Sequence, residues 1–155
     1  MNPLDKFIKQ GYELFSCYEK PEQCIDHQGD FEYLEYEKSL TGVMLDDLEM
    51  NHLGHICWGP LSALGAEAIA YYMPKLIEFA LLGLNDKADE PFFNLFTLVI
   101  GDPVDHERFS LLGYEQRNYI YRTFLLLKGL NFRDEHLVYG CYDDYFDEAI
   151  ENWKT

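Results

Sequence analysis

The chain has 155 residues, of which 48% are hydrophobic and 16% aromatic, and its 28 acidic residues against 12 basic ones give a net charge of −16. This length fits one domain with a substantial core. The negative charge argues against direct binding to nucleic acid or to an anionic membrane, because both require a basic surface. It favours either plain solubility or a basic protein partner attracted over long range.

No stretch of about 20 uninterrupted apolar residues is present, and the first residues lack the pattern of a secretory signal. We therefore expect a cytoplasmic protein that does not cross a membrane. The four cysteines, Cys17, Cys24, Cys57 and Cys141, are then expected to be free thiols, with a disulfide between Cys17 and Cys24 as the alternative.

The first predicted helix covers residues 3–15. Asn2 can cap its first turn, and Pro3 occupies the first helical position, where its missing N–H costs nothing. Residues at helical spacing form the face expected to pack on the core: Leu4, Phe7, Ile8, Gly11 and Phe15. A polar loop follows at residues 20–29.

A second helix is predicted over residues 30–40, ended by a turn at Thr41 and Gly42. We expect Phe31 and Leu34 to face inward, with Tyr33 and Leu40 as further candidates. The charged side chains are expected to face water: Glu32, Glu35, Glu37 and Lys38.

Two short segments lead to the middle of the chain. Residues 44–50 are expected to form an acidic turn or half-helix. Residues 51–59 are expected to be extended and to anchor Trp58 in the core.

The chain is organised around a predicted central helix at residues 62–84. Only three of its residues are charged, and they share one narrow strip of the helix: Glu67, Lys75 and Glu78. Ser62 is the expected N-cap and Gly83 the expected end. Pro74 falls on the charged strip, where water can reach the carbonyl group that it leaves unbonded, so a kink and not a break is predicted.

Residues 92–100 are apolar at seven of nine positions, which fits either a buried strand or a short helix. Glu90 as cap and Pro91 at the first position favour the helix. A further helix is predicted at residues 114–128, between Gly113 and Gly129. Its apolar stripe contains Ile120, Phe124 and Leu127. On another face Glu115, Asn118 and Arg122 cluster, where a polar network is one option and a local salt bridge the favoured alternative.

Residues 139–153 show the clearest amphipathic pattern. The apolar face contains Tyr142, Phe146, Ala149, Ile150 and Trp153, and the opposite face contains Asp143, Asp144, Asp147, Glu148 and Glu151. Altogether we expect one compact all-α domain over residues 1–155, with about six helices packed around the central kinked helix and at most a minor extended segment.

The acidic face of the last helix is the predicted partner-binding surface. Like charges stack along one side of this helix at a spacing of four residues, which suits contact with a basic partner. Tyr145 and Trp153 are the predicted apolar anchors at its edge. The acidic turn at Asp46, Asp47 and Glu49, together with Glu32 and Glu35, extends this surface if the fold brings the segments together. The alternative is a solvated face without a partner.

The sequence contains few candidate metal ligands and no catalytic motif. His52, His55 and Cys57, with Cys17, Cys24 and His27, supply enough ligands for zinc, but their spacing matches no established metal signature, and neither a metal nor a cofactor is predicted. No nucleophile elbow and no glycine-rich phosphate loop is present. We therefore expect no catalytic residue.

The segment AIAYYMPKL, at residues 68–76, resembles an uncharacterised bacterial family of small acidic proteins with a similar YYxP helix. The resemblance covers residues 10–85, and members of the family also look similar in having an N-terminal helix with positions like Phe7 and Phe15. It implies no activity and no catalytic residue. By analogy, small acidic proteins of this kind often act as antidotes to bacterial toxins.

The first functional hypothesis is therefore an immunity-type inhibitor, an acidic protein that neutralises a basic toxin, for example a nuclease, by protein–protein binding. One alternative is a DNA mimic that inhibits a nucleic-acid-binding enzyme. Another is a small metal-dependent enzyme centred on His52, His55 and Cys57. The sequence does not indicate an oligomeric state.

Overall fold

The computed structural model describes residues 1–26, 31–54, 59–83, 92–133 and 143–154, without the side chains of residues 131–133, 143 and 144. These residues form six α-helices and no strand, which confirms the all-α prediction. The helices are α1 (Pro3–Leu14), α2 (Phe31–Leu40), α3 (Ala66–Leu82), α4 (Phe92–Ile100), α5 (Tyr114–Arg133) and α6 (Asp143–Trp153). Short 3₁₀ turns link them: η1 (Leu45–Asp47), η2 (Met50–His52), η3 (Pro60–Ala63) and η5 (Glu107–Phe109).

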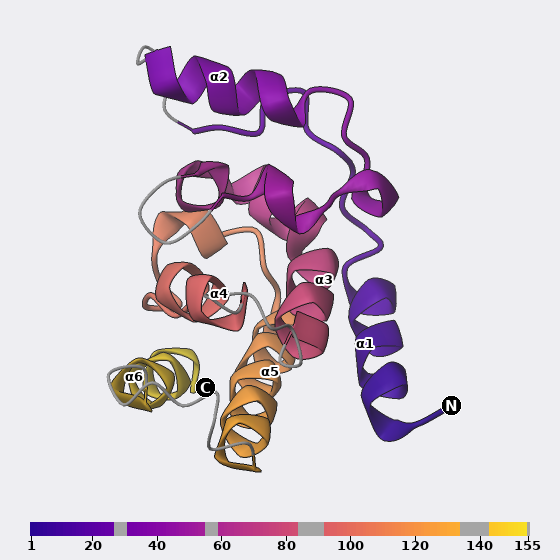
Figure 1. Cartoon of the computed structure of the whole chain (residues 1–155), viewed down its shortest axis with the longest axis vertical. Coiled ribbons are helices and arrows are strands. Elements are labelled where there is room, and N and C mark those ends of the chain that lie inside the picture. The colour runs from indigo at the N-terminus through magenta and orange to yellow at the C-terminus, as the bar shows by residue number, and fades with distance from the viewer. Residues whose placement is uncertain (27–30, 55–58, 84–91, 134–142, 155) are drawn as a thin grey trace.

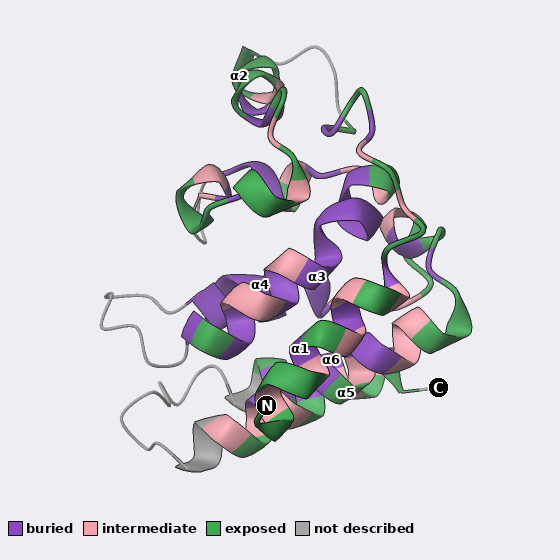
Figure 2. Cartoon of the chain, turned by 90° about the vertical axis from the view of Figure 1, so that its right-hand side faces the viewer, coloured by how far each residue is buried: buried purple, intermediate pink, exposed green. Residues whose placement is uncertain are grey.

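The helix α3 lies at the centre of the fold, as predicted. It packs against α1, α4 and α5 and against the turns η1 and η5. Figure 2 shows α3 and α4 buried over most of their lengths, whereas α1, α2 and α5 expose one side. In the described parts of the chain, none of the helices combines the length and the apolar character needed to cross a lipid bilayer.

The two ends of α3 differ in how well the sequence predicts them. The helix is continuous through Pro74 and ends at Gly83, as predicted. Its start is later than expected, because Gly65 is the N-cap and Ser62 lies in η3, where its hydroxyl donates to the carbonyl of Gly59 at 3.3 Å. The prediction that Ser62 caps the helix is therefore wrong.

The charged strip of α3 is only partly open to solvent, because Glu67 is exposed whereas Glu78 is half-buried at the contact with α1. Pro74 and Ala70 are both buried, contrary to the prediction that water reaches the carbonyl of Ala70. The reason is that α1 packs against α3, where the Tyr12 hydroxyl donates to the Glu78 carboxylate. Lys75 pairs with the same carboxylate at 3.6 Å.

The helix α1 begins as predicted, with the Asn2 side chain accepting the backbone N–H of Asp5 at 2.8 Å. It also packs against α5, where the ring of Phe7 stacks on that of Tyr119 at a centroid distance of 4.5 Å. Arg122 of α5 reaches α1 as well, lying 5.2 Å from the Phe7 ring. Arg122 thus links the two helices and does not form the suggested network with Glu115 and Asn118.

The last three helices form the lower part of the molecule in Figure 1. The predicted helix at residues 92–100 is confirmed as α4, and the proposed cap at Glu90 and Pro91 lies outside the described residues. The apolar stripe of α5 is buried as predicted: Ile120, Phe124 and Leu127. This helix runs past Gly129 to Arg133, further than expected.

The helix α6 packs on α4 and α5 through its apolar face. Phe146, Ala149 and Trp153 are buried, as predicted, whereas Tyr142 lies outside the described residues. The indole N–H of Trp153 donates to the carbonyl of Ile100 at 2.7 Å. Trp153 is fully buried and therefore cannot be the surface anchor that the sequence suggested.

Candidate functional site

The acidic residues gather in the part of the chain between α1 and α3. Residues 19–54 contain ten acidic residues and only two basic ones. We call the described residues of this stretch the acidic lobe; Figure 1 shows its helix α2 at one end of the molecule, far from α6. Its exposed carboxylates are Glu19, Glu22, Asp26, Glu32, Glu35, Asp46, Asp47 and Glu49.

The outer face of α2 carries two large apolar side chains in water. Phe31 is 79% exposed and Leu34 is 52% exposed, so the prediction that both face inward is wrong. The buried residues of this helix are Tyr36 and Leu40. Apolar residues lie all around α2, so helical periodicity alone does not identify its inner side.

A carboxylate holds the chain that precedes α2 against this helix. Glu37 accepts the backbone N–H of Cys24 at 2.9 and 3.0 Å and that of Ile25 at 2.8 Å. Glu37 is half-buried, contrary to the prediction that it faces water. Ile25 in turn forms an isolated antiparallel bridge with Leu64, just before α3. These contacts fix α2 relative to the core while its outer face stays exposed.

The two tyrosines of the YYMP segment position the acidic turn. The Tyr71 hydroxyl accepts the backbone N–H of Leu45 at 2.8 Å, and the Tyr72 hydroxyl donates to the carbonyl of Val43 at 2.6 Å. The turn η1 that follows exposes Asp46 and Asp47. The central helix therefore sets the position of two of the predicted partner-binding residues.

The predicted site residues do not form one surface. Figure 1 shows η1 near the upper end of α3 and α6 at the opposite corner of the molecule, so the fold does not join the two acidic segments. On α6, Asp147, Glu148 and Glu151 are exposed, and Asp147 pairs with Lys128. The side chains of Asp143 and Asp144 lie outside the described residues.

Of the histidines and cysteines considered as zinc ligands, the structure describes His52, Cys17 and Cys24. Within the described stretches, no three His, Cys, Asp or Glu side chains come together in a way that could hold a metal ion. His52 accepts the backbone N–H of Glu49 through Nδ1 at 2.9 Å. Cys17 is exposed and Cys24 buried, both as free thiols. His27, His55, Cys57, Trp58 and Cys141 fall outside the described residues.

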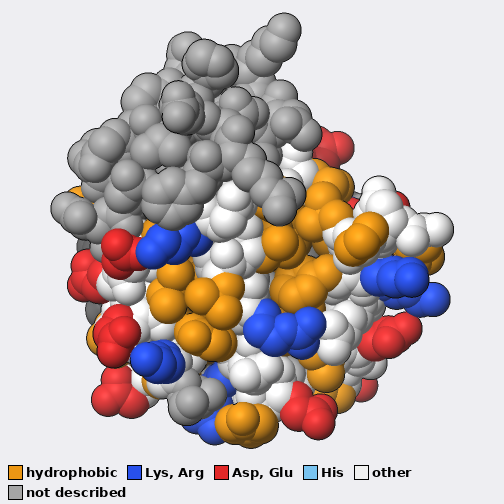
Figure 3. All heavy atoms as spheres, turned by 90° about the horizontal axis from the view of Figure 1, so that it is seen from below, with side chains coloured by type: hydrophobic (Ala, Val, Ile, Leu, Met, Phe, Trp, Pro, Cys, Tyr) orange, Lys and Arg blue, Asp and Glu red, His pale blue; other side chains and the backbone are white. Residues whose placement is uncertain are grey.

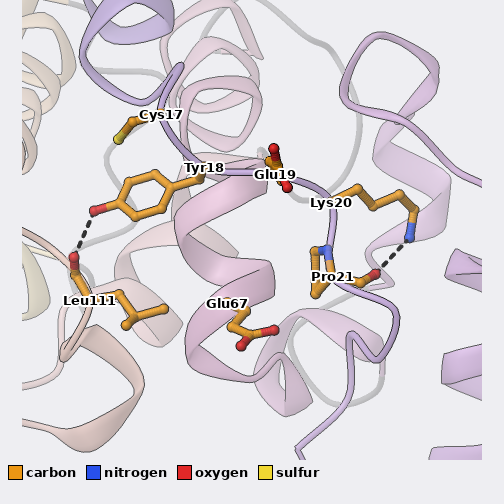
Figure 4. A pocket seen from close by; sticks show the side chains of 7 residues that line it. All are labelled: Cys17, Tyr18, Glu19, Lys20, Pro21, Glu67 and Leu111. Carbon is orange, nitrogen blue, oxygen red and sulfur yellow. Dashed lines mark hydrogen bonds between the residues drawn. The ribbon is translucent and has the colours of Figure 1, made fainter.

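An open hollow of about 370 Å³ lies where the lobe begins, lined by Cys17, Tyr18, Glu19, Lys20, Pro21, Glu67 and Leu111. Figure 4 shows Tyr18 directed to the carbonyl of Leu111 and Lys20 directed to the carbonyl of Pro21. The Tyr18 hydroxyl and the Lys20 amine are thus engaged in structural hydrogen bonds. The Cys17 thiol accepts a hydrogen bond from the Gln116 amide at 3.6 Å. An amide is not a base and cannot take the proton of the thiol. This arrangement does not activate a nucleophile.

A second hollow, of about 140 Å³, includes Asp26, Ser62 and His106, residue types used in nucleophilic catalysis. The Ser62 hydroxyl donates to the carbonyl of Gly59 and not to His106. His106 Nδ1 accepts from the backbone N–H of Arg108 at 3.3 Å. The serine and the histidine therefore do not form the hydrogen-bonded pair that such catalysis requires.

Comparison with protein-family models, with curated proteins and with solved structures finds no match. The resemblance at the YYxP helix therefore stays a prediction. Among the described residues, the feature that best fits a binding site is the acidic lobe, where exposed apolar side chains lie among carboxylates.

Proposed function

We propose that this chain is a non-catalytic binding protein, an immunity-type inhibitor that neutralises a basic toxin by covering it with the acidic lobe. The observation that carries the proposal is the outer face of α2, where Phe31 and Leu34 are exposed beside Glu32 and Glu35. Apolar anchors within a polar rim are the usual composition of a protein–protein interface.

The charge of the lobe supports a basic partner. Ten acidic residues against two basic ones in residues 19–54 produce a local field that attracts a cationic surface over about a Debye length, roughly 8 Å at physiological salt. Such a field accelerates association and makes it sensitive to salt. The carboxylates of Asp46 and Asp47 belong to this lobe, whereas those of α6 would form a separate surface.

The exposed side chains of Phe31 and Leu34 favour a protein partner over the role of a DNA mimic. A mimic presents carboxylates in place of phosphates and gains from an uninterrupted acidic surface. Here two apolar side chains interrupt the carboxylates of α2, and they gain free energy only when the partner covers them.

The test uses the isolated product of the neighbouring reading frame as the partner. We expect a stoichiometric complex that abolishes the toxicity of this product, and an association rate that falls as salt is raised. Three triple variants each remove three negative charges. The lobe variant carries Glu35→Gln, Asp46→Asn and Asp47→Asn, and the α6 variant carries Asp147→Asn, Glu148→Gln and Glu151→Gln. The control variant carries Glu13→Gln, Glu107→Gln and Glu115→Gln.

The lobe variant should slow association several-fold, while the other two leave the rate almost unchanged. A selective loss in the α6 variant would move the interface to that helix. Equal losses in all three variants, or a rate that does not respond to salt, would contradict a defined electrostatic interface.

A further inference from the structure

A second apolar surface lies at the opposite end of the molecule from α2. It is a groove of about 380 Å³ between the start of α1 and the last turns of α5, lined by Asn2, Pro3, Leu4, Phe7, Leu126 and Leu130. None of these residues is charged, although the whole chain has a net charge of −16. A volume of this size falls within the range of natural binding sites.

One basic side chain lies beside the groove. Arg122 is exposed, lies over the ring of Phe7 and donates to Gln10 at 3.3 Å, which keeps its guanidinium beside the groove. In the part of this face that Figure 3 draws in colour, seen from below, hydrophobic side chains gather with Lys and Arg among them, and Asp and Glu lie mainly toward the edge. The groove therefore suits an apolar segment that has acidic neighbours.

The outer face of α2 is such a segment. Phe31 and Leu34 are one turn apart on the exposed side of the helix, and Glu32 and Glu35 lie beside them. Two apolar side chains would leave water on insertion into the groove, while a carboxylate of α2 would approach Arg122. The two surfaces of the chain thus complement each other in both polarity and charge.

We propose that the α1–α5 groove binds the outer face of α2 from a second copy of this chain. Figure 1 shows α2 at the top of the long axis and the first residues of α1, together with the last turns of α5, near the bottom, so one molecule cannot fill its own groove. Because the two surfaces differ, the contact is heterologous, and it continues from copy to copy as an open chain of molecules unless a ring closes. The proposal does not depend on the proposed function, but both use the outer face of α2, so self-association and toxin binding would exclude each other at that face.

The association is measured by light scattering coupled to size-exclusion chromatography over a wide range of protein concentration. We expect the average mass of the natural protein to rise with concentration beyond that of a dimer. A Phe31→Glu, Leu34→Glu variant should stay monomeric, with association weakened at least ten-fold. The control variant Leu111→Glu, Tyr114→Glu adds the same two charges at other exposed positions and should associate normally.

The groove is tested with Leu130→Glu, whose helical content is checked by circular dichroism, and with Arg122→Glu, which leaves the apolar lining intact. Each should be monomeric alone. Mixed with the α2 variant, each retains the surface that its partner lacks, so the mixture should form a one-to-one dimer and nothing larger. A natural protein that is monomeric at all concentrations, groove variants that still associate, or a mixture that stays monomeric would overturn the proposal.

Discussion

The Tyr119 ring of α5 occupies the space beside Gly11 of α1. A β-carbon built on Gly11 would lie 2.7 Å from the Cζ atom of Tyr119, closer than real side chains approach. The Tyr119 hydroxyl donates to the carbonyl of Phe7 at 2.8 Å, one turn earlier on α1. Glycine at position 11 therefore sets the distance at which these two helices pack.

We expect Gly11→Ala to destabilise the protein and Gly129→Ala to stabilise it. Both glycines are helical, and alanine is favoured in a helix by about 1 kcal/mol. At Gly11, displacing the buried Tyr119 ring opposes this gain with an overpacking cost of about 1–3 kcal/mol. At Gly129, nothing lies within 4 Å of the added carbon, so the gain remains. Urea unfolding of both variants measures the two signs, and an equal shift in the same direction would contradict the close contact.

The sequence predicts most helices of this fold because helical periodicity reports burial wherever one face packs on the core. It places the buried stripes of α1, α5 and α6 correctly. It fails on α2, because apolar residues point in all directions around this helix. The helix is attached through Glu37, which accepts backbone N–H groups, and hydrophobic periodicity does not predict such a contact. The exposed positions of Phe31 and Leu34 were missed for this reason.

Two further differences have simple causes. A buried Pro74 was unexpected because the angular position of a residue does not reveal that another helix covers it. The end of α5 was placed too early because an exposed glycine inside a helix costs only about 1 kcal/mol, which the packing of the next turn can offset. The acidic turn η1 was predicted, but its separation from α6 depends on tertiary structure alone.

The hydrogen bond between Tyr12 and Glu78 predicts an energetic coupling between α1 and α3. Burial, and next the hydrogen bond to Glu78, raise the pKa of the Tyr12 phenol well above its usual range. We expect Tyr12→Phe and Glu78→Gln each to destabilise the protein, with a coupling of about 1.5–3 kcal/mol in a double-mutant cycle, the usual range for a hydrogen bond to a charged group. Additive effects, measured by urea unfolding at neutral pH, would exclude this interaction.

The buried phenols predict a loss of stability in alkali. Burial, followed by the hydrogen bond to Glu32, raises the pKa of Tyr36 from its ordinary value of 10.0 to about 12. Burial also raises the pKa of Tyr72 and of Tyr119. Each folded-state pKa lies above the unfolded value, so this contribution to stability is complete below pH 10 and is lost as the pH rises toward the folded-state pKa.

Urea midpoints measured on either side of pH 10 check this expectation, with tyrosinate absorption recorded in parallel. Tyr36→Phe should reduce the steepness of the alkaline loss, because the variant has one buried phenol fewer. Tyr114→Phe, at an exposed phenol, is the matched control and should leave it unchanged. A midpoint that stays constant through the ionisation of the tyrosines would show that these phenols ionise in the folded state without cost.

The Glu37 carboxylate predicts that α2 can be loosened without unfolding the core. Glu37→Ala would leave the N–H groups of Cys24 and Ile25 without this acceptor, and a buried donor that loses its partner costs about 1–3 kcal/mol. Because α2 and the preceding chain lie at one end of the molecule, the loss should be local. Hydrogen exchange of the α2 amides should accelerate strongly, while the amides of α3 keep their protection.

Glu35→Ala is the matched control, because it removes an equal charge at an exposed position of the same helix. It should have little effect on the exchange of either set of amides. If it accelerated exchange as much as Glu37→Ala does, the attachment of α2 would not depend on Glu37.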